Sequence, residues 1–178
     1  MIYILILLLT IILTSRVDLM YENLTGVLIL PQYRYFAIIH IILCACFFAY
    51  KTLLIYKTLP IQKNIYKYII ILTGITMMIG SLFPYTINSR DLFSILHVYC
   101  SMLSCLSFLI LLWIYTRLLS LYQPHIYHKI HWFYDLSLQF LAIFTIVFTR
   151  VNGYIEILFT LLVCSYLYMI EKELKKQP

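Results

Sequence analysis

The chain has 178 residues, of which 63% are hydrophobic and 11% charged, and its mean hydropathy is +0.94. Soluble domains carry about 45–50% apolar and about 25% charged residues, so 13 basic and 7 acidic residues are too few for a water-facing surface. This composition excludes soluble enzymes, soluble DNA-binding domains and disordered proteins. It predicts an integral membrane protein.

Apolar residues form long unbroken runs rather than an alternating pattern, which indicates helices and not barrel strands. We therefore predict an all-α, polytopic transmembrane bundle that forms a single domain over residues 1–178. The six expected spans are Ile2–Thr14, Tyr35–Ile55, Tyr68–Phe83, Leu92–Leu119, Trp132–Phe148 and Ile155–Ile170.

The first span is short, but it lacks the basic start and small-residue cleavage site of a signal peptide, so we expect it to be retained. Three connections between the spans are expected to be loops: Ser15–Arg34, Thr58–Lys67 and Ser120–His131. Within the first of them, the apolar stretch Gly26–Leu30 is expected to lie along the membrane interface or to dip between helices.

Basic residues are distributed unequally between the two sides of the predicted bundle. One side has nine (Lys51, Lys57, Lys63, Lys67, Arg117, Lys129, Lys172, Lys175 and Lys176), and the other has four (Arg16, Arg34, Arg90 and Arg150). By the positive-inside rule the first side faces the cytoplasm, with both termini inside. Attraction to anionic lipids accounts for the basic balance, so nucleic acid is not an expected partner.

Two histidines, His40 and His97, stand early in spans that enter from the outer side. At 1.5 Å per residue, both imidazoles are expected roughly 8–9 Å below that surface. Either each is hydrogen-bonded separately within the bundle, or the two share a water, a lipid headgroup, a metal or a haem. Three arginines at the same end complete a candidate ligand-binding site: Arg34, Arg90 and Arg150.

The fourth span carries Ser94, His97, Ser101 and Ser104 on one helical face. Small residues let neighbouring helices approach closely, which predicts a packing seam. The third span has a comparable face, on which Gly74 and Ser81 are positioned to receive a neighbouring helix.

A second polar stripe begins the fifth span: His128, His131, Asp135 and Gln139. His131 and Asp135 are one turn apart, a spacing that suits a histidine–carboxylate pair holding a proton or a metal ligand. The alternative is an amphipathic turn at headgroup level, beside Trp132 and Tyr134. In either case an acid at the start of a span is expected to have a partner.

The five cysteines are Cys44, Cys46, Cys100, Cys105 and Cys164. None forms a Cys-x-x-Cys motif, and all lie in predicted spans, where cysteine behaves as a small apolar residue. We also find no nucleophile elbow, zinc-protease motif or phosphate-binding glycine loop.

The segment Gly80-Ser81-Leu82-Phe83-Pro84, followed by His97 in the next span, resembles a bacterial family of six-helix membrane proteins of unknown function. That family is distantly related to the DRAM and Sfk groups. The match rests on Gly80, Phe83, Pro84 and His97. It implies a polytopic integral membrane protein of the bacterial cytoplasmic membrane, with a link to lipid organisation among eukaryotic relatives.

Three functions remain open from the sequence. The first is a non-enzymatic protein that binds lipid or a membrane partner, either another protein or a second copy of the chain. The second is an intramembrane enzyme that uses a metal or haem at His40 and His97. The third is a small transporter, which the lack of charged residues near the predicted midplane disfavours. No cofactor is predicted.

Overall fold

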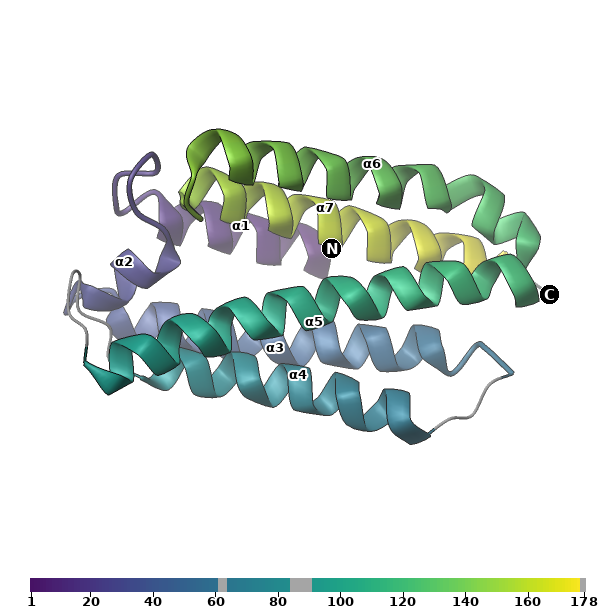
Figure 1. Cartoon of the computed structure of the whole chain (residues 1–178), viewed down its shortest axis with the longest axis horizontal. Helices are drawn as coiled ribbons and strands as arrows, with labels where there is room; N and C mark the ends of the chain where they lie inside the picture. The colour runs from purple at the N-terminus through teal and green to yellow at the C-terminus, as the bar shows by residue number, and fades with distance from the viewer. Residues whose placement is uncertain (61–63, 84–90, 177–178) are drawn as a thin grey trace. The chain divides into compact units, whose positions relative to one another are not determined.

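The computed structural model describes residues 1–60, 64–83 and 91–176 (Figure 1). Within these ranges the chain is helical and has no β-strand. Its helices are α1 (Ile2–Thr14), α2 (Leu24–Ile29), α3 (Arg34–Tyr56), α4 (Asn64–Leu82), α5 (Leu92–Tyr122), α6 (Pro124–Phe148) and α7 (Gly153–Leu174). The all-α prediction is confirmed.

Five of these helices, α3 to α7, are long and apolar enough to cross a membrane, with lengths from 19 to 31 residues. The sixth apolar helix, α1, has 13 residues. A helix needs about 20 residues to cross the hydrocarbon core, so α1 is shorter than a perpendicular span. The chain is a helical membrane protein.

The predicted bounds agree with the structure at α1 and within a few residues for most other helices. The predicted loop Ser120–His131 is wrong. Helix α5 runs to Tyr122 and α6 begins at Pro124, so only Gln123 separates them. The first two turns of α6 contain polar residues, so their low hydropathy did not predict a membrane span. Pro124 fits the first turn of a helix, because amides in that turn have no acceptor within the helix.

Contacts divide the chain into two units, which are described separately below. Unit 1 consists of Met1–Val27 and Thr116–Pro178, and unit 2 of Leu28–Tyr115. The expectation of a single domain stays a prediction, as does the orientation in the membrane.

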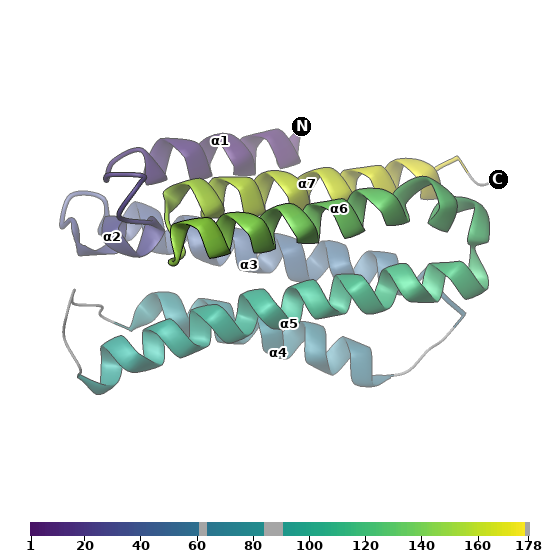
Figure 2. The ribbon, with the colours of Figure 1, turned by 45° about the horizontal axis from the view of Figure 1, so that its top comes forward.

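In unit 1, helix α7 packs against both α1 and α6 (Figure 2). The start of α1 is joined to the end of α7 by a hydrogen bond from the Tyr3 hydroxyl to Glu171 Oε2, 2.8 Å long. The Tyr3 ring also meets the Tyr168 ring edge-on, with centroids 5.9 Å apart. These contacts place the chain's first residues beside its last helical turns.

At the other end of unit 1, the segment after α1 is fastened to the start of α7. Asn152 caps α7 by accepting the Ile155 N–H at 3.1 Å, and its amide donates to the carbonyl of Met20 at 3.3 Å. The Gly153 N–H lies between two carbonyls of the same segment, Leu19 at 3.1 Å and Glu22 at 2.7 Å. We call this arrangement the loop clasp.

The apolar stretch in the first loop forms a helix of its own, α2. Its first amide, Leu24 N–H, donates to the Glu156 carboxylate of α7 at 2.6 Å. Asn23 also donates to the carbonyl of Val151 at 3.0 Å. The Glu156 side chain is therefore engaged in holding the start of α2.

In unit 2, α3 packs along α4 (Figure 2). Gly74 makes this approach close, because a Cβ there would lie 3.2 Å from Ala49 Cβ. Helix α5 contacts α3 through the Phe48 and Phe108 rings, 5.5 Å apart, and through Tyr56, whose hydroxyl donates to the Leu111 carbonyl at 2.6 Å.

Candidate functional site

His97 is buried, and its Nδ1–H donates to the carbonyl oxygen of Gly80 at 2.8 Å. Gly80 lies in the last turn of α4, where carbonyls lack a donor from their own helix. The residue four positions on is Pro84, which lies outside the described residues and, as a proline, has no N–H to donate. His97 therefore caps the end of α4.

Two residues of the predicted packing seam on α5, His97 and Ser101, lie at this contact. A Cβ at Gly80 would lie 3.2 Å from Cys100 Cβ and 3.3 Å from Ser101 Oγ. The two helices therefore come close at a position where α4 has no side chain. Ser104, also buried, donates its hydroxyl to the Ser101 carbonyl within α5. The described contact between α4 and α5 is made by Gly80 with His97, Cys100 and Ser101.

His40 is also buried, and its described contact is with Cys44 on the same helix. Cys44 Sγ lies 3.5 Å from His40 Nε2 and 3.9 Å from Nδ1. The sequence analysis missed this pair, although a spacing of four residues on a helix is a readable signal for a side-chain contact. The described partners of His40 and His97 thus differ, and a shared site between them stays a prediction.

The candidate site with the outer arginines Arg34, Arg90 and Arg150 stays a prediction. Arg34 is exposed at the start of α3 in unit 2, whereas Arg150 is exposed in unit 1, after α6. Arg150 stacks over the Tyr21 ring, 5.1 Å from its centroid. Arg90 lies outside the described residues.

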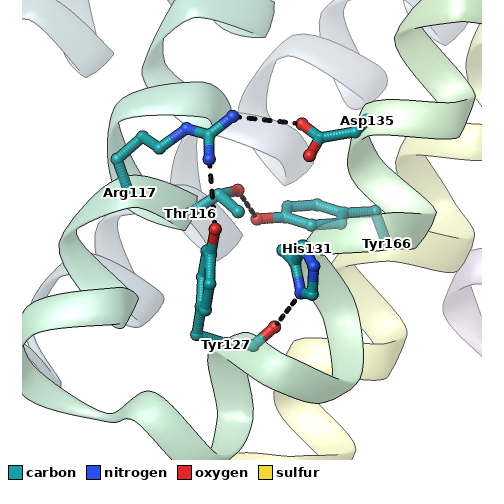
Figure 3. Close-up of polar contacts among 6 residues, drawn as sticks. All are labelled: Thr116, Arg117, Tyr127, His131, Asp135 and Tyr166. Carbon is teal, nitrogen blue, oxygen red and sulfur yellow. Dashed lines mark hydrogen bonds and ion pairs between the residues drawn. The ribbon is translucent and has the colours of Figure 1, made fainter.

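The polar stripe of α6 forms part of a cluster with Arg117 of α5, shown in Figure 3. The Arg117 guanidinium contacts Asp135 Oδ1 at 3.4 Å and donates to the Tyr127 hydroxyl at 3.1 Å. Asp135 therefore has the partner that an acid at the start of a span requires. This partner is an arginine and not His131.

His131 instead donates its Nδ1–H to the Tyr127 carbonyl at 2.9 Å, and its ring stacks on the Tyr127 ring with centroids 4.5 Å apart. His128 meets His131 edge-on at 6.3 Å and is exposed, as is Gln139. The four residues of the stripe lie on one helix, but His131 and Asp135 bind different partners: the Tyr127 carbonyl and the Arg117 guanidinium.

Between the Arg117–Asp135 pair and His131, Figure 3 shows a hydrogen bond between the Thr116 and Tyr166 hydroxyls, which links α5 to α7. The Tyr166 ring packs on Tyr134 of α6, with centroids 5.1 Å apart. These two contacts join α5, α6 and α7, and the neighbouring Arg117–Asp135 pair is partly exposed, at 45% and 37%.

Charged side chains gather at the end of unit 1 where α5 ends, α6 begins and α7 ends. Glu173 holds the ammonium groups of Lys129, at 2.8 Å, and Lys176, while Glu171 pairs with Lys175 at 3.1 Å. The lysine side chains are more than half exposed, at 56%, 55% and 73%. We call this surface the basic end; its basic members are Arg117, Lys129, Lys172, Lys175 and Lys176.

Hydroxyl groups along the apolar helices mostly donate to carbonyls of their own helix. Examples are Thr10 to Ile6, Thr76 to Leu72, Ser137 to Phe133, Thr145 to Leu141 and Thr160 to Glu156. Such bonds satisfy the hydroxyl without a ligand or a neighbouring helix. Among the described residues, no three histidine, cysteine or acidic side chains are placed to hold one metal ion.

The chain matches no family model, no curated protein and no solved structure. Its resemblance to the six-helix membrane family stays a prediction.

Proposed function

We propose that the chain is a non-enzymatic protein of the bacterial cytoplasmic membrane that binds anionic lipid headgroups through the basic end of unit 1. The proposal rests on how two lysines of the basic end are held in place and on how exposed they are. Lys129 and Lys176 are held together by Glu173, which is only 14% exposed, while their own side chains are more than half exposed. The carboxylate fixes two cations side by side without covering them.

The polar residues inside the helices support the non-enzymatic part of the proposal. His97 is engaged with the end of α4, and most intramembrane hydroxyls that the structure describes bond to their own helix. These groups stabilise the helices and their packing. Groups that remain exposed and charged lie mainly at helix ends, where lipid headgroups are.

The charge at the basic end suits an anionic surface. Five basic and three acidic side chains leave an excess of positive charge, and each lysine near an anionic leaflet contributes about 1 kcal/mol of attraction. Arg117 adds a planar donor group, oriented by Tyr127 and Asp135, that can face a phosphate. Membrane lipids are therefore the proposed partners, and the proposed orientation puts the basic end on the cytoplasmic side.

The test measures how much added lipid raises the Tm of the detergent-purified protein. A ligand that binds only the folded state stabilises it by RT ln(1 + [L]/Kd), so at equal concentration the tighter-binding lipid raises Tm more. We expect phosphatidylglycerol to raise Tm more than phosphatidylcholine, and we expect high salt to reduce the difference. The double variant Lys129→Gln/Lys176→Gln, which removes the two cations that Glu173 holds, should lose most of that difference.

The matched control removes the same charge from the other end of unit 1, with Arg16→Gln and Arg150→Gln. It should keep the preference for phosphatidylglycerol, with each variant measured against its own lipid-free Tm. Equal effects of the two lipids on the natural chain would refute the proposal. Equal losses in the two double variants would show that net charge alone, and not the basic end, sets the preference.

A further inference from the structure

Glu173 holds two lysines from different parts of unit 1 against the two oxygens of one carboxylate. Lys129 of α6 reaches Oε2 at 2.8 Å, and Lys176, just after the end of α7, reaches Oε1. The two lysine nitrogens are therefore separated by no more than two ion-pair distances and the width of a carboxylate. Because an ammonium has three N–H donors, each lysine keeps donors for a ligand while its position is fixed.

The excess positive charge of the basic end lies around this carboxylate. Its other two ion pairs, Arg117 with Asp135 and Lys175 with Glu171, are each neutral. Lys172 is exposed and precedes Lys176 by four residues, so both lie on one side of the end of α7. Three lysines less the one carboxylate leave a charge of +2. This charge matches a headgroup with two phosphate diesters, each of which carries one negative charge.

Helix α6 provides an exposed apolar face directly beyond Lys129. Trp132, Leu136 and Phe140 follow this lysine by three, seven and eleven residues, a spacing that puts all four on one side of the helix. The exposed fractions of the three apolar side chains are 53%, 42% and 46%. Tryptophan favours the level where headgroups meet the hydrocarbon core, and Trp132 lies one turn from the lysine. A lipid whose phosphates contact the lysines can therefore lay its acyl chains along this face.

We propose that Lys129, Lys172 and Lys176 bind a lipid whose headgroup joins two phosphates through a single glycerol, as cardiolipin does. Once the first phosphate is bound, the link holds the second close to the neighbouring ammonium, so the two contacts form as one unit. Two separate lipids with one phosphate each have no such link. This inference rests on the proposed function of the basic end and adds the class of lipid that it selects.

The test is native mass spectrometry of the full-length, detergent-purified protein, given cardiolipin and phosphatidylglycerol at equal concentrations of phosphate. One cardiolipin has as many phosphates and acyl chains as two phosphatidylglycerol molecules, so the link between the phosphates is the main difference. The natural chain should prefer cardiolipin by about tenfold or more. Glu173→Gln gains positive charge but no longer holds both ammonium groups. It should still prefer phosphatidylglycerol to phosphatidylcholine, yet lose most of its preference for cardiolipin.

Glu171→Gln is the matched control, because it makes the same change of charge two residues away and leaves an acceptor for the Tyr3 hydroxyl. It should keep the preference for cardiolipin. Equal retention of cardiolipin and phosphatidylglycerol by the natural chain would overturn this inference but not the proposed function, whereas equal retention of phosphatidylglycerol and phosphatidylcholine would overturn both. An undiminished preference for cardiolipin in Glu173→Gln would also overturn the inference. Unchanged helical circular dichroism and gel-filtration volume establish that each variant is folded.

Discussion

His97 donates its Nδ1–H to the carbonyl of Gly80, 17 residues earlier, and so supplies a donor where Pro84 can supply none. The four residues on which the family resemblance rests include this glycine, this proline and this histidine. Their combination therefore has a structural explanation: a helix that ends before a proline and is capped by a side chain from the next helix.

Replacing His97 tests this explanation. His97→Leu leaves the Gly80 carbonyl buried without its donor, which typically costs about 1–3 kcal/mol, so the Tm of the purified protein should fall clearly. His97→Gln retains an N–H donor and should recover part of the loss. Identical Tm values for the natural chain and His97→Leu would show that the cap does not stabilise α4.

The loop clasp depends on both ends of the Asn152 amide. Asn152→Ala removes the cap of α7, at a cost of about 1 kcal/mol, and also the bond to the Met20 carbonyl. Asn152→Asp keeps an acceptor for the Ile155 N–H but loses the donor. Thermal unfolding should rank the natural chain first, Asn152→Asp second and Asn152→Ala last, and a reversed order of the two variants would contradict this division of roles.

Gly153 stands where the loop clasp leaves no room for a side chain. A Cβ there would lie 2.6 Å from Leu19 Cδ2, 2.8 Å from Thr14 Cγ2 and 3.2 Å from the Leu19 backbone. Gly153→Ala should therefore lower stability by about 1–3 kcal/mol, measured as a fall in Tm. Gly26→Ala is the control, because its nearest neighbour is the carboxylate end of Glu22, which can swing aside. Equal effects at the two glycines would argue against the clasp.

A substitution at Thr149 is expected to stabilise the protein rather than destabilise it. It ends α6 with φ of 55°, in the left-handed region that costs a residue with a side chain about 1–2 kcal/mol. Thr149→Gly should raise Tm, because glycine adopts this conformation without that penalty. Thr145→Gly, one turn earlier within α6, should lower Tm. A fall in Tm for Thr149→Gly would show that its side chain contributes more than the backbone strain costs.

The apolar runs predicted the helices well, because a membrane-spanning segment must satisfy its backbone hydrogen bonds within itself. A long apolar run is therefore also a helix. The method failed where helices extend beyond the apolar region. The first two turns of α6 are polar and follow Pro124, so hydropathy did not reveal them. The stretch that forms α2 is apolar but too short for a span, and its start is held by the Glu156 contact, which the sequence does not show.

Contacts between residues far apart in the sequence were harder to predict from the sequence. The i,i+4 contact of His40 with Cys44 could have been found from spacing alone. In contrast, Asp135 pairs with Arg117 of another helix while His131 bonds to the backbone of its own, and a single sequence carries no signal for that choice. The same holds for Lys129 and Glu173, which are 44 residues apart.

The central claim is that the basic end binds anionic lipid, and native mass spectrometry of the protein released from detergent tests it most directly. The natural chain, given equal amounts of phosphatidylglycerol and phosphatidylcholine, should retain predominantly the anionic lipid. Lys129→Gln/Lys176→Gln should lose that preference, and Arg16→Gln/Arg150→Gln should keep it. Retention of both lipids in equal amounts by the natural chain would contradict the account.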